Sequence, residues 1–527
     1  MYMKMRGIIY IVILILLSSC GNFLDEYSQD LVVPKTVSDL NEVLLGNGYI
    51  PSSEIEYLRS GSIGWQLNIL DDDINTVIAY NAVKGRTEMD QVYYGYTTWQ
   101  MEVGRNYTGD NLSGDNGNWD ALYQRINSMN IILHELGNVS QNTEQEVKDA
   151  IRVQGECYFL RAQFYLMLVN LYAKAYDPDN AATEPGVPLK LTYYVEHDKE
   201  KETQFDRTSV AKVYEQIVKD LKEAVRCFTE SPQTKSFYRA SEDAALLLLS
   251  RVYLYMGEWQ LVIDECDEII KMGCSLWDLN NFDPGTATFG CKRDYFLAKE
   301  SPEIFFTQGA GVVGLLMDNQ NITSQTRYRA SDELYGIYSK YEKDGILDLR
   351  KNCFFEMSKR DNGYFFVRKN PMFDATVFDS FLLRSGEIYL NKAEAQAMLD
   401  QADAINTMKE LMNKRYADHK LPVIDGLSGK ELIQFIREER RKELCFEGHR
   451  WFDLRRYAVS PKYPETKAIT HVIFKPGTSL MDKAPYDRSY VLQPYGEDNA
   501  WVLPIPEEEL VFNNGVMVDN PERIERE

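Results

Sequence analysis

Hydrophobic residues recur every three or four positions through several long stretches of the chain. Between Trp119 and Leu136, for example, Leu122, Ile126 and Met129 fall on one stripe. This spacing places apolar side chains on one face of an α-helix. The pattern predicts helices over Trp119–Leu136, Glu144–Ala173, Val210–Phe228, Ala244–Met256, Leu261–Met272, Leu383–Leu399 and Ala402–Arg415.

Short turns join consecutive helices, which indicates that they pack as hairpins. Gly257 breaks one helix just before the next begins, and small residues such as Ala245 and Ala393 let paired helices approach closely. This arrangement is similar to the tetratricopeptide pattern. Because irregular insertions of unequal length separate the pairs, the pattern favours a mainly α scaffold decorated with long loops over a regular solenoid.

A highly charged helical stretch follows near residue 440. Ser428 and Glu431 form a capping-box pattern at its start, and pairs such as Glu438 and Lys442 are one turn apart. We interpret the stretch as structural, with charges that satisfy one another around an apolar anchor, and not as an active site. The anchor residues are Leu444, Phe446, Trp451 and Leu454.

The N-terminus has the features of a lipoprotein signal peptide. Lys4 and Arg6 precede an apolar run over Ile8–Leu17, which is too short for a bilayer span of about 20 residues. Small residues then lead to Cys20, as in a lipobox, in which the Cys takes a lipid and becomes the mature N-terminus. We therefore predict a signal peptide over residues 1–19 and a lipidated tether over 20–35.

Charge excludes some functions, and aromatic content suggests another. The chain has 58 basic and 80 acidic residues among 527, a net charge of −22, which argues against nucleic acid and against a polybasic contact with lipid. Tyr, Phe and Trp make up 12% of the sequence, with Tyr the most frequent at 34. Tyr suits wet binding surfaces, since its ring has an apolar face and a polar tip.

Motifs for catalysis, metals and cofactors are weak. Gly309–Gly314 matches GxGxxG, but no helix is predicted after it, so a dinucleotide site is not favoured. Asp110–Asp120 offers hard oxygens without EF-hand spacing and is better read as a solvated turn. The histidines are scattered, and the seven cysteines after Cys20 lack disulfide or zinc spacing. We predict no catalytic residue, metal or cofactor.

The chain resembles the SusD/RagB family of nutrient-binding outer-membrane lipoproteins of Bacteroidetes. The resemblance rests on several motifs spread along the mature chain, of which Glu447–Leu454 (EGHRWFDL) is the most specific. The other matching pieces are Cys20 with Phe23-Leu24-Asp25, the set Trp119, Tyr123, Asn127 and Asn130, the stretch Leu383–Ala395, and the stretch Arg437–Arg456.

The resemblance implies a single domain over residues 36–527, built on about four tetratricopeptide-like helix pairs with a loop-rich half. We place the pairs at about 119–176, 210–272, 383–415 and 428–456. It also implies a lipid-anchored, cell-surface protein without enzymatic activity, which acts as a hinged lid on a SusC-like TonB-dependent outer-membrane transporter. Members mostly bind glycans, and some bind peptides.

Binding residues cannot be transferred by motif, because the family's ligand contacts lie on variable loops. A sugar presents apolar C–H faces and a rim of hydroxyls, so we expect flat aromatic rings with polar groups beside them. The predicted stacking residues are Trp65, Tyr94, Trp99 and Trp277, and the predicted hydroxyl acceptors are Asp72 and Asp73. Asp71–Asp73 could instead accept a metal or start a solvated helix.

Two alternatives remain open at this point. The same architecture could capture peptides, in which case the pocket should be apolar and loop groups should read the ligand backbone. A surface glycoside hydrolase would instead need two positioned carboxylates, and 80 acidic residues provide many chance pairs.

Overall fold

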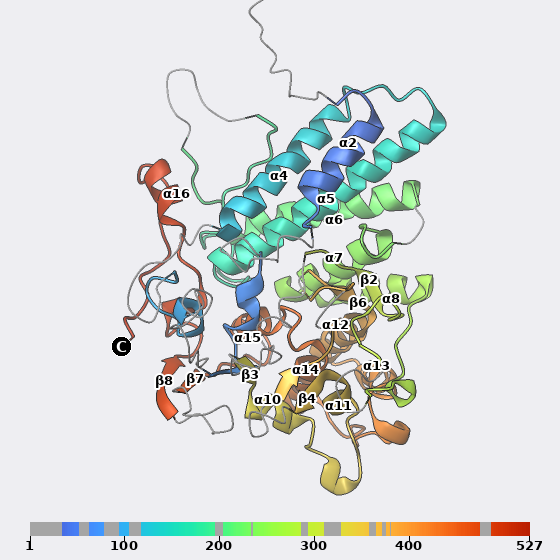
Figure 1. Ribbon diagram of the computed structural model, residues 1–527, viewed down its shortest axis with the longest axis vertical. Helices are drawn as coiled ribbons and strands as arrows, with labels where there is room; N and C mark the ends of the chain where they lie inside the picture. Colours follow the sequence, from blue (N-terminus) through green and yellow to red (C-terminus); the bar gives the residue numbers. More distant parts are fainter. Residues whose placement is uncertain are drawn as a thin grey trace, which may run out of the picture.

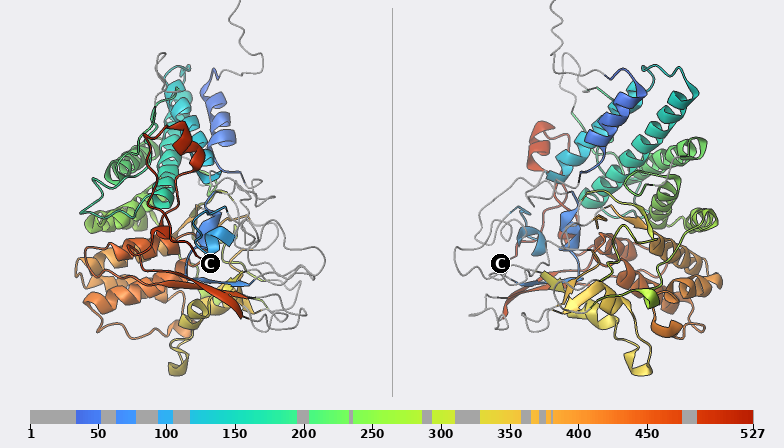
Figure 2. Two further views of the ribbon diagram at one scale, coloured as in Figure 1. Left: turned by 90° about the vertical axis from the view of Figure 1, so that its left-hand side faces the viewer. Right: turned by 45° about the vertical axis from the view of Figure 1, so that its right-hand side comes forward.

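The structure is a computed structural model, and it places helices on one side and a small sheet on the other (Figures 1 and 2). The lipobox, the run at 110–116 and most of the GxGxxG motif lie outside the residues that it describes. The described residues are 34–51, 63–77, 94–104, 117–194, 204–232, 236–285, 293–309, 328–357, 365–370, 376–379, 381–474 and 486–526.

Helices packed in succession form the scaffold (Figure 1). In the series α4, α5, α6, α7 and α8, each helix packs on the next. Helix α8 then packs on α12, which also contacts α13 and α14. The short helix α2 (Val37–Val43) lies against α4 and α5. The main helices are α4 (Gly117–Glu135), α5 (Glu144–Tyr172), α6 (Val210–Glu230), α7 (Glu242–Met256), α8 (Trp259–Met272), α12 (Ser385–Met398), α13 (Asp403–Met412), α14 (Gly429–Leu444) and α15 (Arg450–Ala458).

Local sequence explains where the helices start, end and meet. A capping box begins α5, in which Thr143 Oγ1 accepts from the amide of Glu146 and the Glu146 carboxylate accepts from the amide of Thr143. Gly257 ends α7 with a left-handed φ of 78°. At Gly155, a Cβ atom would lie 2.7 Å from Cys227 Cβ on α6, so only glycine permits this close helix contact.

The predicted helices are confirmed within a few residues, with two local corrections. Leu383 and Arg384 form strand β6 instead of a first helical turn, because they pair with β2 (Ile304–Phe306). Ser428 does precede α14, but its side chain makes no capping hydrogen bond, so the predicted capping box with Glu431 is wrong.

A four-stranded sheet in the order β3-β1-β7-β8 lies beside the helices (Figure 2). The strands are β1 (Ile74–Val77), β3 (Tyr328–Ala330), β7 (Ile469–Phe474) and β8 (Tyr486–Leu492). β1 runs antiparallel to β3 and parallel to β7, and β7 pairs antiparallel with the edge strand β8. The sheet therefore joins three parts of the chain that are far apart in sequence.

Short elements complete the loop-rich half. Strands β4 (Phe355–Met357) and β5 (Phe365–Val367) form a two-stranded sheet. The short helices are α10 (Asp332–Ile337), α11 (Arg350–Phe354) and α16 (Glu507–Phe512), with 3-10 turns η3 (Trp65–Asn68), η4 (Leu279–Asn281), η5 (Glu342–Asp344), η6 (Ala417–His419) and η7 (Asn499–Trp501), and a π-helical turn η1 (Leu44–Gly48). No helix in the described ranges combines the length and the apolarity that a membrane crossing requires.

The charged stretch around α14 is structural, as predicted, and its apolar anchor residues are all buried. The predicted pair of Glu438 and Lys442 does not form. Glu438 instead forms an ion pair with Lys340, and Lys442 forms ion pairs with Asp348 and Glu439. Five buried carboxylates and five buried cations form one connected network of ion pairs. Its members are Glu303, Asp348, Glu439, Glu443 and Glu447, and Arg350, Lys369, Arg384, Arg415 and Lys442.

This network predicts sensitivity to acid. Burial opposes ionisation of Glu439, but Arg350 and Lys442 outweigh it and lower its pKa from 4.5 to about 2. A carboxylate with a lowered pKa stabilises the fold above its unfolded-state pKa, and that contribution is lost as the pH falls towards the folded-state value. We expect Glu439 to contribute on the order of 3 kcal/mol that disappears between about pH 4.5 and 2.

Urea unfolding at pH values from 7 down to 2 would measure this effect. Glu439→Gln should be less stable than the unmodified protein at pH 7 and should lose less stability on acidification. Glu144→Gln is the matched control, because Glu144 forms an exposed ion pair with Lys148. An acid response that is equally steep in Glu439→Gln would contradict the assignment.

Candidate ligand-binding site

Four of the six predicted ligand residues come together around the four-stranded sheet. Asp72 and Asp73 immediately precede β1, while Tyr94 and Trp99 lie in the following described segment and contact β8 and β7. Asp72, Asp73 and Trp99 are buried, and we call them the frame; Tyr94 is partly exposed.

Asp72 belongs to the frame, because cations occupy both of its carboxylate oxygens. Arg450 donates to them from Nε (2.7 Å) and Nη2 (2.9 Å), and Lys467 donates from Nζ at 2.6 Å. Burial acts to raise the pKa of Asp72, but Arg441, Arg450 and Lys467 outweigh it and hold the pKa well below its usual range. The carboxylate is thus a fixed anion within an ion-pair cluster.

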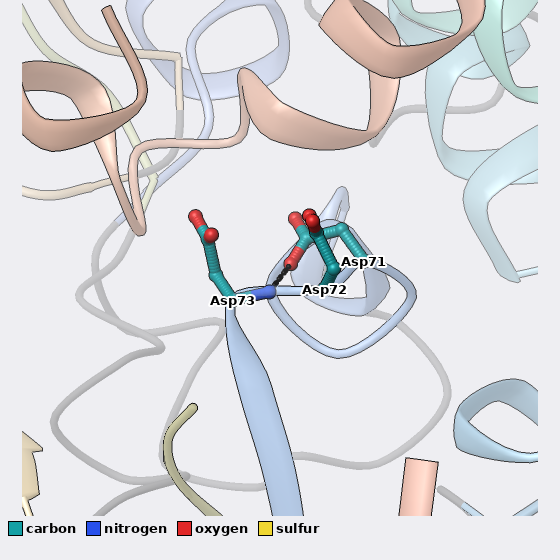
Figure 3. A group of neighbouring side chains, drawn as sticks. All are labelled: Asp71, Asp72 and Asp73. Carbon is teal, nitrogen blue, oxygen red and sulfur yellow. Dashed lines mark hydrogen bonds between the residues drawn. The ribbon is translucent and has the colours of Figure 1, made fainter. Parts of the chain in front are cut away.

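Asp73 and Asp71 are also buried, and their side chains lie beside that of Asp72 at the start of β1 (Figure 3). Arg441 Nε donates to Asp73 Oδ1 at 2.7 Å, and the Asp73 amide donates to Asp71 Oδ1 at 2.9 Å. Burial and the two neighbouring carboxylates raise the pKa of Asp71 well above its usual range, which favours its neutral form.

These contacts correct the predicted role of the aspartates. Both oxygens of Asp72 and one oxygen of Asp73 face Arg or Lys side chains, and all three aspartates are buried, so they do not form a solvated helix start. The prediction that Asp72 and Asp73 accept sugar hydroxyls does not fit this burial. The three carboxylates offer ligand atoms within 4.8 Å of one another, but guanidinium and ammonium groups already supply the positive charge that a metal would bring. The cluster ties the start of β1 to α14 and α15.

Trp99 is also part of the frame. Its ring is fully buried, stacks on His471 with centroids 4.3 Å apart, and donates from Nε1 to the Leu70 carbonyl at 3.0 Å. A ring enclosed on both faces cannot stack on a sugar, so the predicted stacking role of Trp99 is not supported in this conformation. Its role is to hold the segment of residues 94–104 against β7.

Tyr94 remains as a partly exposed aromatic residue on this frame. Its hydroxyl hydrogen-bonds to that of Tyr490 on β8, and the two rings meet edge to face with centroids 6.0 Å apart. The Arg488 side chain lies against Tyr490 and is 55% exposed, and the Tyr486 residue is 60% exposed. We call Tyr94, Tyr486, Arg488 and Tyr490 the β8 rim, in which Tyr490 is buried and supports Tyr94 from beneath.

Sequence reasoning missed the β8 part of this rim. Part of the signal was present, because Arg488 and Tyr490 alternate as residues on one face of a strand do, whereas the pairing register with β7 shifts between Arg488 and Tyr486. The pairing of this strand with the segment around Tyr94 depends on the fold and leaves no local trace in the sequence.

The two remaining predicted residues, Trp277 and Trp65, make no contact with the rim among the described residues. Trp277 is half-buried between α8 and η4, where its ring packs 5.1 Å from Phe282 and 6.3 Å from Phe296, and its amide donates to Glu303 at 2.8 Å. Trp65 begins η3 after left-handed Gly64, and its side chain lies outside the described part of the structure.

Comparison with known proteins identifies relatives along nearly the whole chain. A SusD-like family model, described as starch-binding and associating with the outer membrane, matches residues 66–254, and the SusD family model (SusD/RagB) matches residues 371–522. A SusD-like protein of Formosa agariphila is 22% identical over 517 residues, covering 87% of this chain and 90% of its own length.

Solved structures share the fold. A SusD superfamily protein from Bacteroides thetaiotaomicron aligns with a TM-score of 0.69 at 20% identity, covering 92% of this chain and all of the other. A laminarin-binding SusD-like protein aligns with a TM-score of 0.57 at 19% identity, covering 93% of this chain and all of the other. From the two family matches and this shared helical architecture, we conclude that the chain belongs to the SusD/RagB family.

Proposed function

We propose that this protein is a surface lipoprotein that captures a glycan and delivers it to a SusC-like TonB-dependent outer-membrane transporter, on which it acts as a lid. Membership of the SusD/RagB family supports the glycan, the transporter and the outer-membrane location. The lipobox at Cys20 supports attachment by lipid alone. The protein is then a binder and not an enzyme.

The β8 rim carries the assignment of the binding surface. Tyr94 and Tyr490 brace each other through their hydroxyls, which fixes the two rings on a buried frame. Tyr490 is only 3% exposed and therefore acts as the support, while the partly exposed Tyr94 ring that it fixes loses little conformational freedom when a ligand binds.

The chemistry of the rim suits a neutral or weakly anionic sugar. Tyr rings offer flat apolar faces for the C–H side of a pyranose, and phenol and guanidinium groups can hydrogen-bond its hydroxyls. Because Arg488 is on the exposed edge of a protein with a net charge of −22, it also provides a local positive charge there.

Replacing rim residues should weaken glycan binding without unfolding the protein. We expect Tyr486→Ala and Tyr94→Ala each to reduce affinity by about tenfold, since an aromatic contact contributes roughly 0.5–1.5 kcal/mol beyond burial of its area. Affinity gels with a panel of soluble polysaccharides, starting with laminarin, would identify the ligand, and calorimetry would measure it. Tyr194→Ala is the control, since Tyr194 is also exposed, at 53%, and its ring lies by Tyr193 and Lys190, which are not part of the rim.

Other outcomes would redirect the proposal. Loss of binding in Trp65→Ala or Trp277→Ala, with the rim variants unaffected, would place the site at those residues instead. Heat released by a peptide digest, with every glycan inert, would favour the peptide-binding alternative. Product formation from a bound glycan, abolished by one Asp or Glu substitution that leaves binding intact, would favour a hydrolase.

A further inference from the structure

Residues of α4 and of the C-terminal helix α16 line a groove that is separate from the β8 rim. Its volume is about 440 Å³, which is in the range of small-molecule sites. Residues from α4, from the segments around 188 and 205, and from the C-terminal region line it. They are Trp119, Asp120, Tyr123, Gln124, Asn127, Pro188, Lys190, Phe205, Glu509, Phe512 and Met517.

Aromatic rings form the walls of this groove. Trp119 and Tyr123 are one turn apart on α4, with ring centroids separated by 5.0 Å. Phe205 and Phe512 also line the groove, and Phe512 is 57% exposed. An exposed Phe beside a cavity lined by three further rings is typical of a surface that a ligand covers.

Two carboxyl groups, those of Asp120 and Glu509, line the same groove. Neither forms an ion pair with a Lys or Arg in the described part of the chain. Burial, followed by the negative charge of Glu508, raises the pKa of Asp120, and burial together with Asp120 raises the pKa of Glu509. Like charge therefore surrounds both carboxyl groups, and Glu509 also takes part in a hydrogen bond with the Trp119 side chain, which acts to lower its pKa.

Lys190, a cation that lines the groove, is turned towards its own segment. Lys190 lines the groove, but its ammonium group donates to the carbonyl of Thr192 at 2.8 Å and to that of Tyr194 at 2.5 Å. Gln124 and Asn127 continue the polar side of the groove along α4. The groove therefore combines an aromatic wall with two acids that have no ion pair among the described residues, and a positively charged ligand is complementary to it.

We propose that this groove binds a primary ammonium group carried on a partly apolar ligand. The ammonium would lie between Asp120 and Glu509, where it receives charge-assisted hydrogen bonds, and the apolar part would contact the aromatic rings. An amino sugar and a lysine side chain both present this chemistry. The site is distinct from the β8 rim and does not depend on the glycan assignment.

Calorimetry at low salt with matched pairs of probes would test the site. The first pair is glucosamine against glucose, and the second is acetyl-Gly-Lys-Gly-amide against the same peptide with norleucine. We expect the amine of at least one pair to bind about tenfold or more tightly than its neutral partner. The amine that binds more tightly then shows whether the natural ligand is an amino sugar or a lysine side chain. Equal affinity within both pairs, or no amine binding, would overturn the proposal.

Charge-removing variants locate the ammonium. Asp120→Asn and Glu509→Gln should each weaken amine binding by about tenfold while changing the neutral partner little, since a hydrogen bond to a charged group is lost. Glu507→Gln is the matched control, because Glu507 is an exposed carboxylate on α16 that does not line the groove. Unchanged amine affinity in both groove variants would refute the assignment.

The pH dependence gives an independent readout. Amine affinity should fall as the pH is lowered from 7 towards 4, because the two carboxyls become protonated while an ammonium with a pKa near 10 stays charged. Glu508, Lys190 and Tyr123 are the other titratable groups at the groove, and Arg207 is a further charged group that acts on Tyr123. Tyr486→Ala should leave amine binding unchanged, so failure of this site and failure of the rim are distinguishable.

Discussion

Replacing Glu443 with Gln is expected to lower the free energy of unfolding by about 3–5 kcal/mol, which is the usual cost of removing one partner from a buried ion pair. Glu443 accepts from Arg384 at 2.7 Å, from Arg415 at 2.8 and 2.9 Å and from Arg350 at 3.2 Å. Because Gln has nearly the same shape, the variant removes charge without opening a cavity. Three buried guanidinium groups would then lose their shared anion.

Urea unfolding at pH 7 would measure this loss. Glu438→Gln provides the comparison, since Glu438 lies on the same helix and pairs with the half-exposed Lys340. It should cost about 1 kcal/mol or less, as surface pairs generally do. A similarly small loss in Glu443→Gln would show that the network tolerates an uncompensated cation and is less tightly coupled than its geometry indicates.

Trp451→Ala is expected to destabilise the protein by about 3–5 kcal/mol, because it removes a large ring from a packed core. Trp451 is 2% exposed and stacks on Trp501 with centroids 4.6 Å apart and planes 20° apart. The ring thus joins α15 to the C-terminal segment, and its loss would leave a cavity between them.

The corresponding Trp259→Ala variant serves as a control for loss of an indole, because Trp259 is only half-buried at the start of α8. It should cost clearly less in the same thermal or urea unfolding experiment. A nearly neutral Trp451→Ala would mean that α15 is not part of the cooperative core.

The helices could be predicted from the sequence because their signal is local. The apolar stripes of α4 and α6 lie within single segments, and the residues on those stripes are buried in the structure. The anchor role of Trp451 followed from the same reasoning, since a large apolar ring within a charged helical stretch is usually buried against the rest of the fold.

The exposure of loop residues could not be predicted in this way. Trp99 is buried because His471 covers it, and Asp72 is neutralised because Arg441 and Arg450 reach it, although these partners are more than 360 residues away in sequence. An aromatic or acidic loop residue has the same local sequence whether its partner is water, a ligand or a distant strand. Only the assembled sheet distinguishes these cases, and it leaves Tyr94 as the partly exposed residue.

The strand order of the four-stranded sheet has a consequence for how the protein matures. β1 lies between β3 and β7, so a strand made early in synthesis remains unpaired on both edges until residues near 330 and 470 have been made. Such non-local pairing is slow to form. The last strand to join is β8, which supplies most of the proposed rim, so the capacity to bind would arise only in molecules that have completed almost the entire chain. Premature termination would then yield fragments that retain helices but do not compete for the ligand.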